Sequence, residues 1–159
     1  MTQVRVGQGF DVHPFVDDPE RALVLGGVTF ESERALRGHS DADVIAHACT
    51  DALLGAAGLG DIGEHFPDTD PTWAGADSIG LLAEATRRVR EAGWDPGNVD
   101  ASVVTDHPKL APARTQMQQR LSDAVGAPVT VKGRRPEGLG ALGRGEGVAC
   151  WAVAVVTRP

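Results

Sequence analysis

The sequence predicts a single α/β domain, residues 1–159, of the α+β sandwich kind, with a mixed β-sheet and helices packed on one face. The first observation is the order of its elements, because strand-like and helix-like segments follow one another as β-β-α-α-β-α-β-β. The second is the length of 159 residues, which suits one domain. The third is that no repeat, low-complexity block or linker divides the chain.

Two strands are predicted near the N-terminus. Alternation with a period of two predicts a strand over Val4–Gly7. The apolar segment Ala22–Phe30 predicts a second strand, and Gly26 with Gly27 indicates a bulge or a close backbone approach within it.

Two helices are expected to follow. Ser40 is predicted to cap the first helix, whose end is weakened by Gly55 and Gly58. Its apolar face consists of Val44, Ile45, Ala48, Cys49, Ala52 and Leu53. Ser78 is predicted to cap the second helix, which stops at Gly93. The segment between the two helices, Gly60–Gly75, is rich in Gly, Pro and Asp and is expected to be a loop.

The C-terminal half is predicted to alternate strand and helix. Asn98–Thr105 is a strand, and Pro112 suits the first turn of a helix that runs to about Val125. Val129–Lys132 and Val148–Thr157 are two further strands. The last of these is apolar throughout, so we expect it to be central and covered.

Composition and charge exclude several classes of function. Fifteen basic and 22 acidic side chains give a net charge of −7, and the chain has four Phe, three Trp and no Tyr. These values argue against binding to nucleic acid or to an anionic membrane surface. A phosphorylated ligand would need a local basic site or a metal ion.

Several features indicate a cytoplasmic protein. Met1–His13 carries no apolar signal core, and the longest apolar run, Val148–Val156, is too short to span a bilayer. The two cysteines, Cys49 and Cys150, lie far apart and are expected to be small buried hydrophobes in a reducing compartment.

Two groups of residues are candidate metal ligands. Asp11 and His13 are separated by one residue, so in a strand they project a carboxylate and an imidazole from one face. Asp43, His47 and Asp51 recur every four residues along one stripe of the first helix, and His47 is a candidate third ligand. The alternatives are a surface Asp and His near a turn, and a solvated polar stripe.

Two further segments suit a phosphorylated polyol. His39 and Ser40 stand where a helix begins, where backbone N–H groups favour an anion, although Ser40 could equally be just a cap. The acidic segment from Asp61 to Gly63 and from His65 to Asp70 offers acceptors for sugar or polyol hydroxyls. The alternative is that this loop only stays hydrated.

A basic, glycine-rich segment follows the strand at Val129–Lys132. Lys132, Arg134 and Arg135 precede Glu137 and the half-glycine run Gly138–Gly147. Glycine lets backbone amides approach an anion, and Arg binds phosphate through two hydrogen bonds. The segment lacks the Gly-Lys-Ser/Thr of a nucleotide-binding P-loop, and no helix is expected there. The alternative is a flexible basic hairpin.

A series of motifs keeps its order over nearly the whole chain: Gly9-Phe10-Asp11-Val12-His13, Gly38-His39-Ser40-Asp41-Ala42-Asp43, Thr50-Asp51-Ala52-Leu53-Leu54-Gly55-Ala56, Gly60-Asp61-Ile62-Gly63, Phe66-Pro67-Asp68-Thr69-Asp70, Gly75-Ala76-Asp77-Ser78 and Gly143-Arg144-Gly145-Glu146-Gly147. Together they resemble the 2-C-methyl-D-erythritol 2,4-cyclodiphosphate synthase family of the non-mevalonate isoprenoid pathway. The resemblance implies a homotrimer with active sites between neighbouring subunits. It implies that the 2-phosphate of 4-diphosphocytidyl-methylerythritol 2-phosphate attacks the β-phosphorus and that CMP leaves.

The resemblance also assigns roles to residues. It makes Asp11, His13 and His47 the ligands of Zn²⁺, and Glu137 a ligand of Mg²⁺ or Mn²⁺ between the α- and β-phosphates. His39 and Arg135 match positions that are catalytic in the family. Phe10, Arg144 and Glu146 match a cavity on the trimer axis proposed for isoprenoid diphosphates. The implied substrate contacts are Asp11, Val12, His13, His39, Ser40, Asp61, Ile62, Gly63, Phe66, Pro67, Asp68, Thr69, Asp70, Thr105, Asp106, His107, Pro108, Lys109, Leu110, Ala111, Arg134, Arg135, Pro136, Glu137, Ala141 and Arg144.

One segment departs from the family. Arg134, Arg135 and Pro136 stand where the family has threonines, and Ala141 replaces a larger apolar residue. Either guanidinium groups replace hydroxyl donors on the phosphates, or catalysis is weakened. The weakened case predicts a trimeric protein that only binds isoprenoid diphosphates. A third hypothesis is a metal-dependent phosphoesterase, but no residue stands out as its water-activating base.

Overall fold

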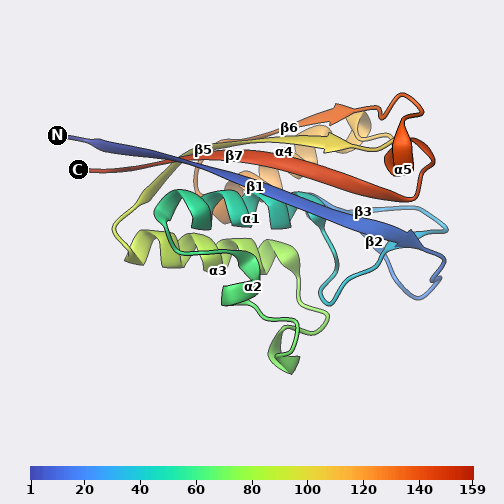
Figure 1. Cartoon of the computed structure of the whole chain (residues 1–159), viewed down its shortest axis with the longest axis horizontal. Helices are drawn as coiled ribbons and strands as arrows, with labels where there is room; N and C mark the ends of the chain where they lie inside the picture. Colours follow the sequence, from blue (N-terminus) through green and yellow to red (C-terminus); the bar gives the residue numbers. More distant parts are fainter.

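The computed structural model describes all 159 residues, and its main feature is a five-stranded mixed sheet in the order β4-β1-β7-β5-β6 (Figure 1). The strands are β1 (Gln3–Val16), β4 (Ala35–Leu36), β5 (Asp95–Val104), β6 (Val129–Arg134) and β7 (Gly147–Arg158). Only β5 and β6 are parallel; the other neighbours are antiparallel. The predicted mixed sheet is confirmed.

Three long helices lie on one face of this sheet. They are α1 (Val44–Ala57), α3 (Ser78–Glu91) and α4 (Arg114–Val125). Helix α1 packs on β1, β7 and β5, while α4 packs on β6 and on α3. The shorter helices are α2 (Ile62–His65), α5 (Gly140–Gly143), η1 (Pro71–Trp73) and η2 (Ala111–Ala113). None of the helices has the length and apolar character needed to cross a membrane.

Strand β1 is much longer than the predicted Val4–Gly7. It runs from Gln3 to Val16 and pairs with β7 from Gln3 to Pro14. Gly7 and Gly9, within this strand, allow helix α1 to pack directly on its backbone. A Cβ on Gly7 would stand 2.1 Å from the carbonyl oxygen of Ala52, and a Cβ on Gly9 would stand 1.9 Å from that of Ala48. Pairing with β7 continues through both glycines, so they do not end the strand.

The predicted strand Ala22–Phe30 is wrong, because the segment forms a hairpin outside the main sheet. Its strands are β2 (Leu23–Leu25) and β3 (Val28–Phe30). Gly26 and Gly27 have φ of 58° and 73° and form the two-residue turn, for which positive φ is required. The short strand β4, which pairs with the end of β1, was not predicted.

The helix caps also differ from those predicted. Asp43 caps α1 and Asp77 caps α3, each by accepting backbone N–H bonds of the first turn, whereas Ser40 lies before α1 and Ser78 lies inside α3. A short helix, α5, lies in the Gly138–Gly147 segment, where none was expected.

The predicted covering of the last strand is only half right. Strand β7 is central, and Cys150, Ala152 and Ala154 face the helices and are buried. On the opposite face Trp151 is 39% exposed and Val153 is 45% exposed. The sheet thus presents one apolar face that this chain does not cover.

Candidate functional site

The site begins where α1 crosses β1. Because Gly9 has no side chain, α1 lies directly on the strand, and His47 on α1 comes beside Asp11 and His13 on β1. Asp11 and His13 share the helix-facing side of the strand, as their spacing predicts, whereas Val12 between them points to the other face and is 49% exposed.

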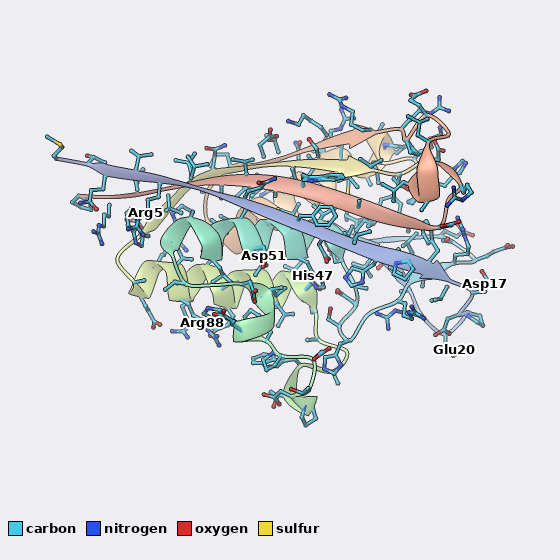
Figure 2. All side chains as sticks on the ribbon, in the orientation of Figure 1. Arg5, Asp17, Glu20, His47, Asp51 and Arg88 are labelled. Atoms are coloured by element: carbon cyan, nitrogen blue, oxygen red, sulfur yellow. The ribbon has the colours of Figure 1, made fainter.

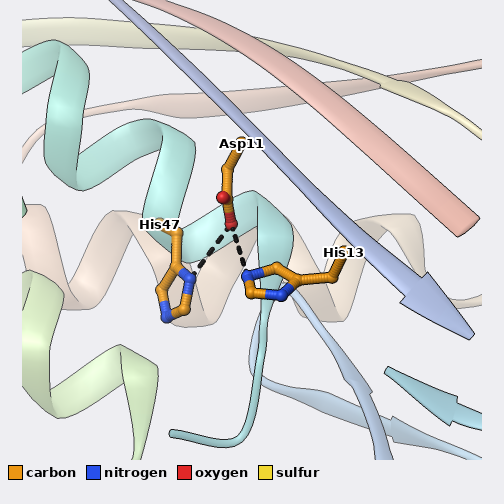
Figure 3. Close-up of side chains that lie close together, drawn as sticks. All are labelled: Asp11, His13 and His47. Carbon is orange, nitrogen blue, oxygen red and sulfur yellow. Dashed lines mark hydrogen bonds and ion pairs between the residues drawn. The ribbon is translucent and has the colours of Figure 1, made fainter. Parts of the chain in front are cut away.

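The three predicted metal ligands converge. Asp11 Oδ2 lies 3.0 Å from His13 Nε2 and 3.0 Å from His47 Nδ1 (Figure 3). The possible ligand atoms of the three residues all lie within 4.8 Å of one another. A tetrahedral zinc with ligand bonds of about 2.0–2.1 Å holds its ligand atoms roughly 3.3 Å apart. The spacing therefore fits a metal ion.

The state of His13 supports this fit. Its Nδ1–H donates to the carbonyl oxygen of Arg37 at 2.7 Å, so the neutral ring, which is the form that binds a metal, carries its lone pair on Nε2. Nε2 is buried and has no hydrogen-bond partner, although it lies at ion-pair distance from Asp11. A buried nitrogen lone pair that faces a carboxylate is an arrangement that a cation between them satisfies.

The charges of the site depend on one another. Burial opposes the charge on Asp11, but contact with His13 and His47 outweighs it and holds the pKa of this carboxyl well below its usual range. Burial likewise opposes the charge on His13, yet contact with Asp11 wins and raises the pKa of the imidazole. Asp11 is therefore an anion at neutral pH, as a metal ligand must be.

A cavity of about 480 Å³ opens above these residues. It also contains His39 and Ser40, the pair predicted to contact a phosphate, which line the same cavity as Asp11, His13 and His47. Its remaining lining residues are Gly38, Ile62, Gly63, Phe66, Pro67, Asp68, Trp73 and Leu81. Gly38, Trp73 and Leu81 were not predicted, since no pattern of chemistry marks them in the sequence.

The acidic segment that lines this cavity is a structured loop, held from α1 and α3. Asp51 on α1 accepts a hydrogen bond from Ile62 N at 2.8 Å, and burial raises the pKa of Asp51 despite this bond. Arg88 on α3 binds His65 Nδ1 at 2.8 Å, and its guanidinium carbon lies over the ring of Phe66, 4.9 Å from the centroid. Figure 2 labels Asp51 on α1 and Arg88 on α3.

Several other predicted site residues stabilise the local backbone and do not line the cavity. Asp61 and Asp70 cap α2 and η1, and Asp61, Thr69 and Asp70 are absent from the cavity lining. The hydrogen bond from Thr72 N lowers the pKa of Asp70. Asp43 is fully buried and binds the backbone N–H groups of Gly26 and Gly27, so the alternative of a solvated polar stripe on α1 is wrong.

A second, smaller cavity of about 180 Å³ lies where β5 and β6 end. Most of the substrate contacts that the resemblance implies between Thr105 and Ala111 meet there. The lining residues are Thr105, Asp106, Pro108, Lys109, Leu110 and Ala111, together with Gly133, Arg134, Arg135 and the unpredicted Arg114. Arg135 Nε lies 3.4 Å from Asp106 Oδ1. The three arginines and Lys109 make this cavity basic.

The remaining predicted site residues lie outside both cavities. His107, Pro136, Glu137, Ala141 and Arg144 line neither. Arg144 pairs with Glu146 at 2.8 Å, and Glu137 is exposed with φ of 52°. Phe10 packs on Trp151 on the uncovered face of the sheet, with ring centroids 4.9 Å apart.

Comparison with known proteins places the whole chain in one family. The YgbB family model matches residues 4–157. A 2-C-methyl-D-erythritol 2,4-cyclodiphosphate synthase of Cupriavidus metallidurans is 55% identical over 98% of this chain and 93% of its own length. The enzyme of the same name from Rubrobacter xylanophilus is 56% identical over 97% of this chain and 95% of its own length.

Solved structures of this family have the same fold as this chain. The bifunctional IspDF of Campylobacter jejuni matches with a TM-score of 0.93 and 40% identity, over 100% of this chain but 43% of that longer chain. A CDP complex of IspF from Plasmodium falciparum matches with a TM-score of 0.81 and 33% identity, over 96% of this chain and 95% of its own. The chain therefore belongs to the YgbB family, among the 2-C-methyl-D-erythritol 2,4-cyclodiphosphate synthases.

Proposed function

We propose that this chain converts 4-diphosphocytidyl-2-C-methyl-D-erythritol 2-phosphate to the 2,4-cyclodiphosphate with release of CMP, in the non-mevalonate isoprenoid pathway. The reaction makes it a phosphorus–oxygen lyase. The observation that carries the proposal is the convergence of Asp11, His13 and His47, with the unpartnered His13 Nε2, in a cavity that also contains His39 and Ser40.

The chemistry needs charge neutralisation and positioning. An oxygen of the 2-phosphate forms a bond to the β-phosphorus, and the bond from that phosphorus to the oxygen bridging to the α-phosphate breaks, so CMP leaves with that oxygen. Both partners are anionic and belong to one molecule, so holding them together is much of the work. A Zn²⁺ held by Asp11, His13 and His47 would supply a Lewis acid for the phosphoryl oxygens.

The chain's other residues bind and orient the substrate. His39 and Ser40 offer donors to a phosphate in the cavity, and Asp68 offers an acceptor to the polyol hydroxyls. The basic cavity at Arg134 and Arg135 suits the cytidine diphosphate, which agrees with the CDP-bound relatives. Within this proposal guanidinium groups replace the family's hydroxyl donors, and Glu137 holds Mg²⁺ or Mn²⁺ with the diphosphate.

The same proposal makes the protein a homotrimer. The two cavities share no lining residue, and in this proposal the substrate extends from the metal ligands of one subunit to the basic cavity of its neighbour. The uncovered sheet face exposes large apolar side chains: Val4, Val6, Phe10, Val12, Trp151 and Val153. Packing three such faces around an axis would bury them and join cavities of neighbouring subunits.

Two further parts of the proposal concern ligands and location. An isoprenoid diphosphate would lie on the trimer axis beside Phe10, with Arg144 and Glu146 at the end of the cavity. The protein would act in the cytoplasm, which agrees with the unpaired thiols of Cys49 and Cys150.

The test is ³¹P NMR of the protein with its proposed substrate, first with Zn²⁺ and Mg²⁺ and then with a chelator. We expect CMP and two coupled cyclic-diphosphate resonances that depend on metal. Unchanged substrate beside a folded, zinc-loaded trimer would overturn the enzyme and leave the isoprenoid-diphosphate-binding protein. That alternative is not favoured, because relatives 55% identical over 98% of the chain are named synthases.

A further inference from the structure

We propose that Ser78 is a positioning residue for the metal centre, which holds the imidazole of His47 in the tautomer and orientation that metal binding requires. The inference deepens the proposed function and rests on its metal site. The structural feature is a partly buried hydrogen-bond chain from Asp41 through Ser78 to His47, which joins the start of α3 to the first turn of α1.

The direction of each hydrogen bond in this chain follows from the chemistry of the groups. The carboxylate of Asp41 only accepts, and it receives both the backbone N–H of Ser78, at 3.1 Å, and the Ser78 hydroxyl. The hydroxyl proton is thereby committed to Asp41. The Ser78 oxygen must then accept at its other contact, so Nε2–H of His47 donates to it at 2.8 Å.

This arrangement fixes the other ring nitrogen of His47. With its proton on Nε2, a neutral imidazole carries its lone pair on Nδ1. Nδ1 is the atom that lies 3.0 Å from Asp11 Oδ2, in the group of possible metal ligands. A ligand histidine normally has its second nitrogen bound in this way, and loss of such a partner typically weakens metal binding 10–100-fold.

Ser40 also lies near His47 but is placed for a different task. Its hydroxyl oxygen is 3.1 Å from His47 Nε2 and accepts the backbone N–H of Ala42 at 3.2 Å. Ser40 lines the cavity, whereas Ser78 is fully buried and does not. The Ser40 hydroxyl also lies 3.4 Å from that of Ser78, and within this proposal it turns from Ser78 to donate to a substrate phosphate.

The local fold keeps Ser78 in this place. Asp77 caps α3 by accepting the backbone N–H of Ile79, so Ser78 stands in the first turn with its own N–H free to bind Asp41. Helix α3 packs against α1, which carries His47. The carboxylate of Asp41 therefore holds Ser78 by both its backbone N–H and its hydroxyl.

The experiment compares zinc affinity, by competition with a chromophoric chelator, in the full-length wild type, Ser78→Ala and Thr86→Val. We expect Ser78→Ala to bind zinc 10–100-fold more weakly. Thr86→Val is the matched control, because it removes another fully buried hydroxyl from the same helix, one that donates only to the carbonyl of Leu82. It should bind zinc as the wild type does. Ser78→Thr keeps the hydroxyl and should restore the affinity.

A second measurement does not depend on the variant's folding. In ¹⁵N-histidine NMR of the zinc-loaded wild type, the Nε2 proton of His47 should be visible and slow to exchange. Rapid exchange of this proton, or equal zinc affinity in wild type and Ser78→Ala, would overturn the role of Ser78 and leave the proposed function intact. A wild type that binds no zinc would instead overturn the metal site itself.

Discussion

At the scale of single residues, the candidate metal site consists of the Asp11 carboxylate held between the imidazoles of His13 and His47. Asp11 loses hydration on burial, and the contacts of His13 and His47 compensate for that loss, which is why its pKa falls although burial alone would raise it. His13 in turn has one nitrogen bound to backbone and the other unpartnered. A metal ion would both neutralise the Asp11 carboxylate and give His13 Nε2 a partner.

The first prediction concerns this carboxylate. Asp11→Asn keeps the shape of the side chain but removes its charge, so zinc affinity should fall by at least about 100-fold, more than typical losses at supporting residues. Zinc content after dialysis, by atomic absorption, measures this. Asp123→Asn, on the exposed surface of α4, is the control and should retain zinc. Full zinc occupancy in Asp11→Asn would contradict the ligand set.

The second prediction concerns the arginine that stands in place of a family threonine. Arg135 is 69% exposed and pairs with Asp106, so Arg135→Thr should change the free energy of unfolding by less than about 1 kcal/mol. Zinc content should not change, because Arg135 lines the other cavity. Binding of cytidine diphosphate, measured by calorimetry, should weaken roughly tenfold, the value of one charge-assisted hydrogen bond. Loss of zinc would show that this segment supports the metal directly.

At the scale of elements, the site exists because α1 approaches β1 unusually closely. Gly7 and Gly9 leave no atoms between the strand and the backbone of the helix. This contact brings His47 to the strand that carries Asp11 and His13. The same glycines that weaken a strand on their own are therefore what assembles the metal ligands.

The third prediction tests this approach. In Gly9→Ala the new Cβ would stand 1.9 Å from the carbonyl oxygen of Ala48, so the free energy of unfolding should fall by about 3 kcal/mol or more. Gly55→Ala, in the last turn of α1, meets nothing closer than 3.9 Å and should raise it by roughly 0.5–1 kcal/mol. Urea denaturation at one protein concentration measures both. A neutral Gly9→Ala would disprove the tight packing.

The fourth prediction concerns the loop that α3 holds in place. Arg88 binds His65 and stacks on Phe66, which lines the cavity, while Glu84 holds the guanidinium at 2.8 Å. Arg88→Met should free the loop and raise KM roughly tenfold, about the value of one charge-assisted hydrogen bond. Its neighbour Arg87 pairs only with Glu84 and with Glu91, so Arg87→Met should leave KM unchanged. Equal KM values in steady-state assays of the two variants would show that the loop holds its shape without Arg88.

At the scale of the whole molecule, the mixed sheet and the helices could be predicted, because periodicity is local. The spacing of Asp11 and His13 indicated only half of a metal site, since His47 lies 36 residues from Asp11, and the resemblance to the family supplied the full set. The hairpin at Gly26 and Gly27 was missed because a turn of two glycines inside an apolar run looks like a bulge. The role of Ser78 has no sequence pattern, since its partner His47 lies 31 residues away. The separation of the two cavities depends on the complete fold, which no spacing shows.

The fifth prediction concerns assembly. Val153 lies on the uncovered face of the sheet and is 45% exposed in one chain. Val153→Asp would place a charge in the core of the proposed trimer, so sedimentation velocity should show monomers of 16.6 kDa where the wild type shows three times that mass. Ala83→Asp, on the exposed side of α3, should remain a trimer. A trimeric Val153→Asp would place the interface elsewhere.

The pairing of β1 with β7 has a consequence for how the chain is connected. Gln3 lies opposite Arg158, and their side chains are hydrogen-bonded at 2.7 Å, so the two ends of the polypeptide lie side by side (Figure 1). The backbone is thus nearly a closed circle, and a short peptide joining the ends would complete it. The junction would lie eight residues along β1 from Asp11, or roughly 26 Å at about 3.3 Å per residue. Circular permutation, with new ends opened in a surface loop, should therefore leave the metal ligands undisturbed.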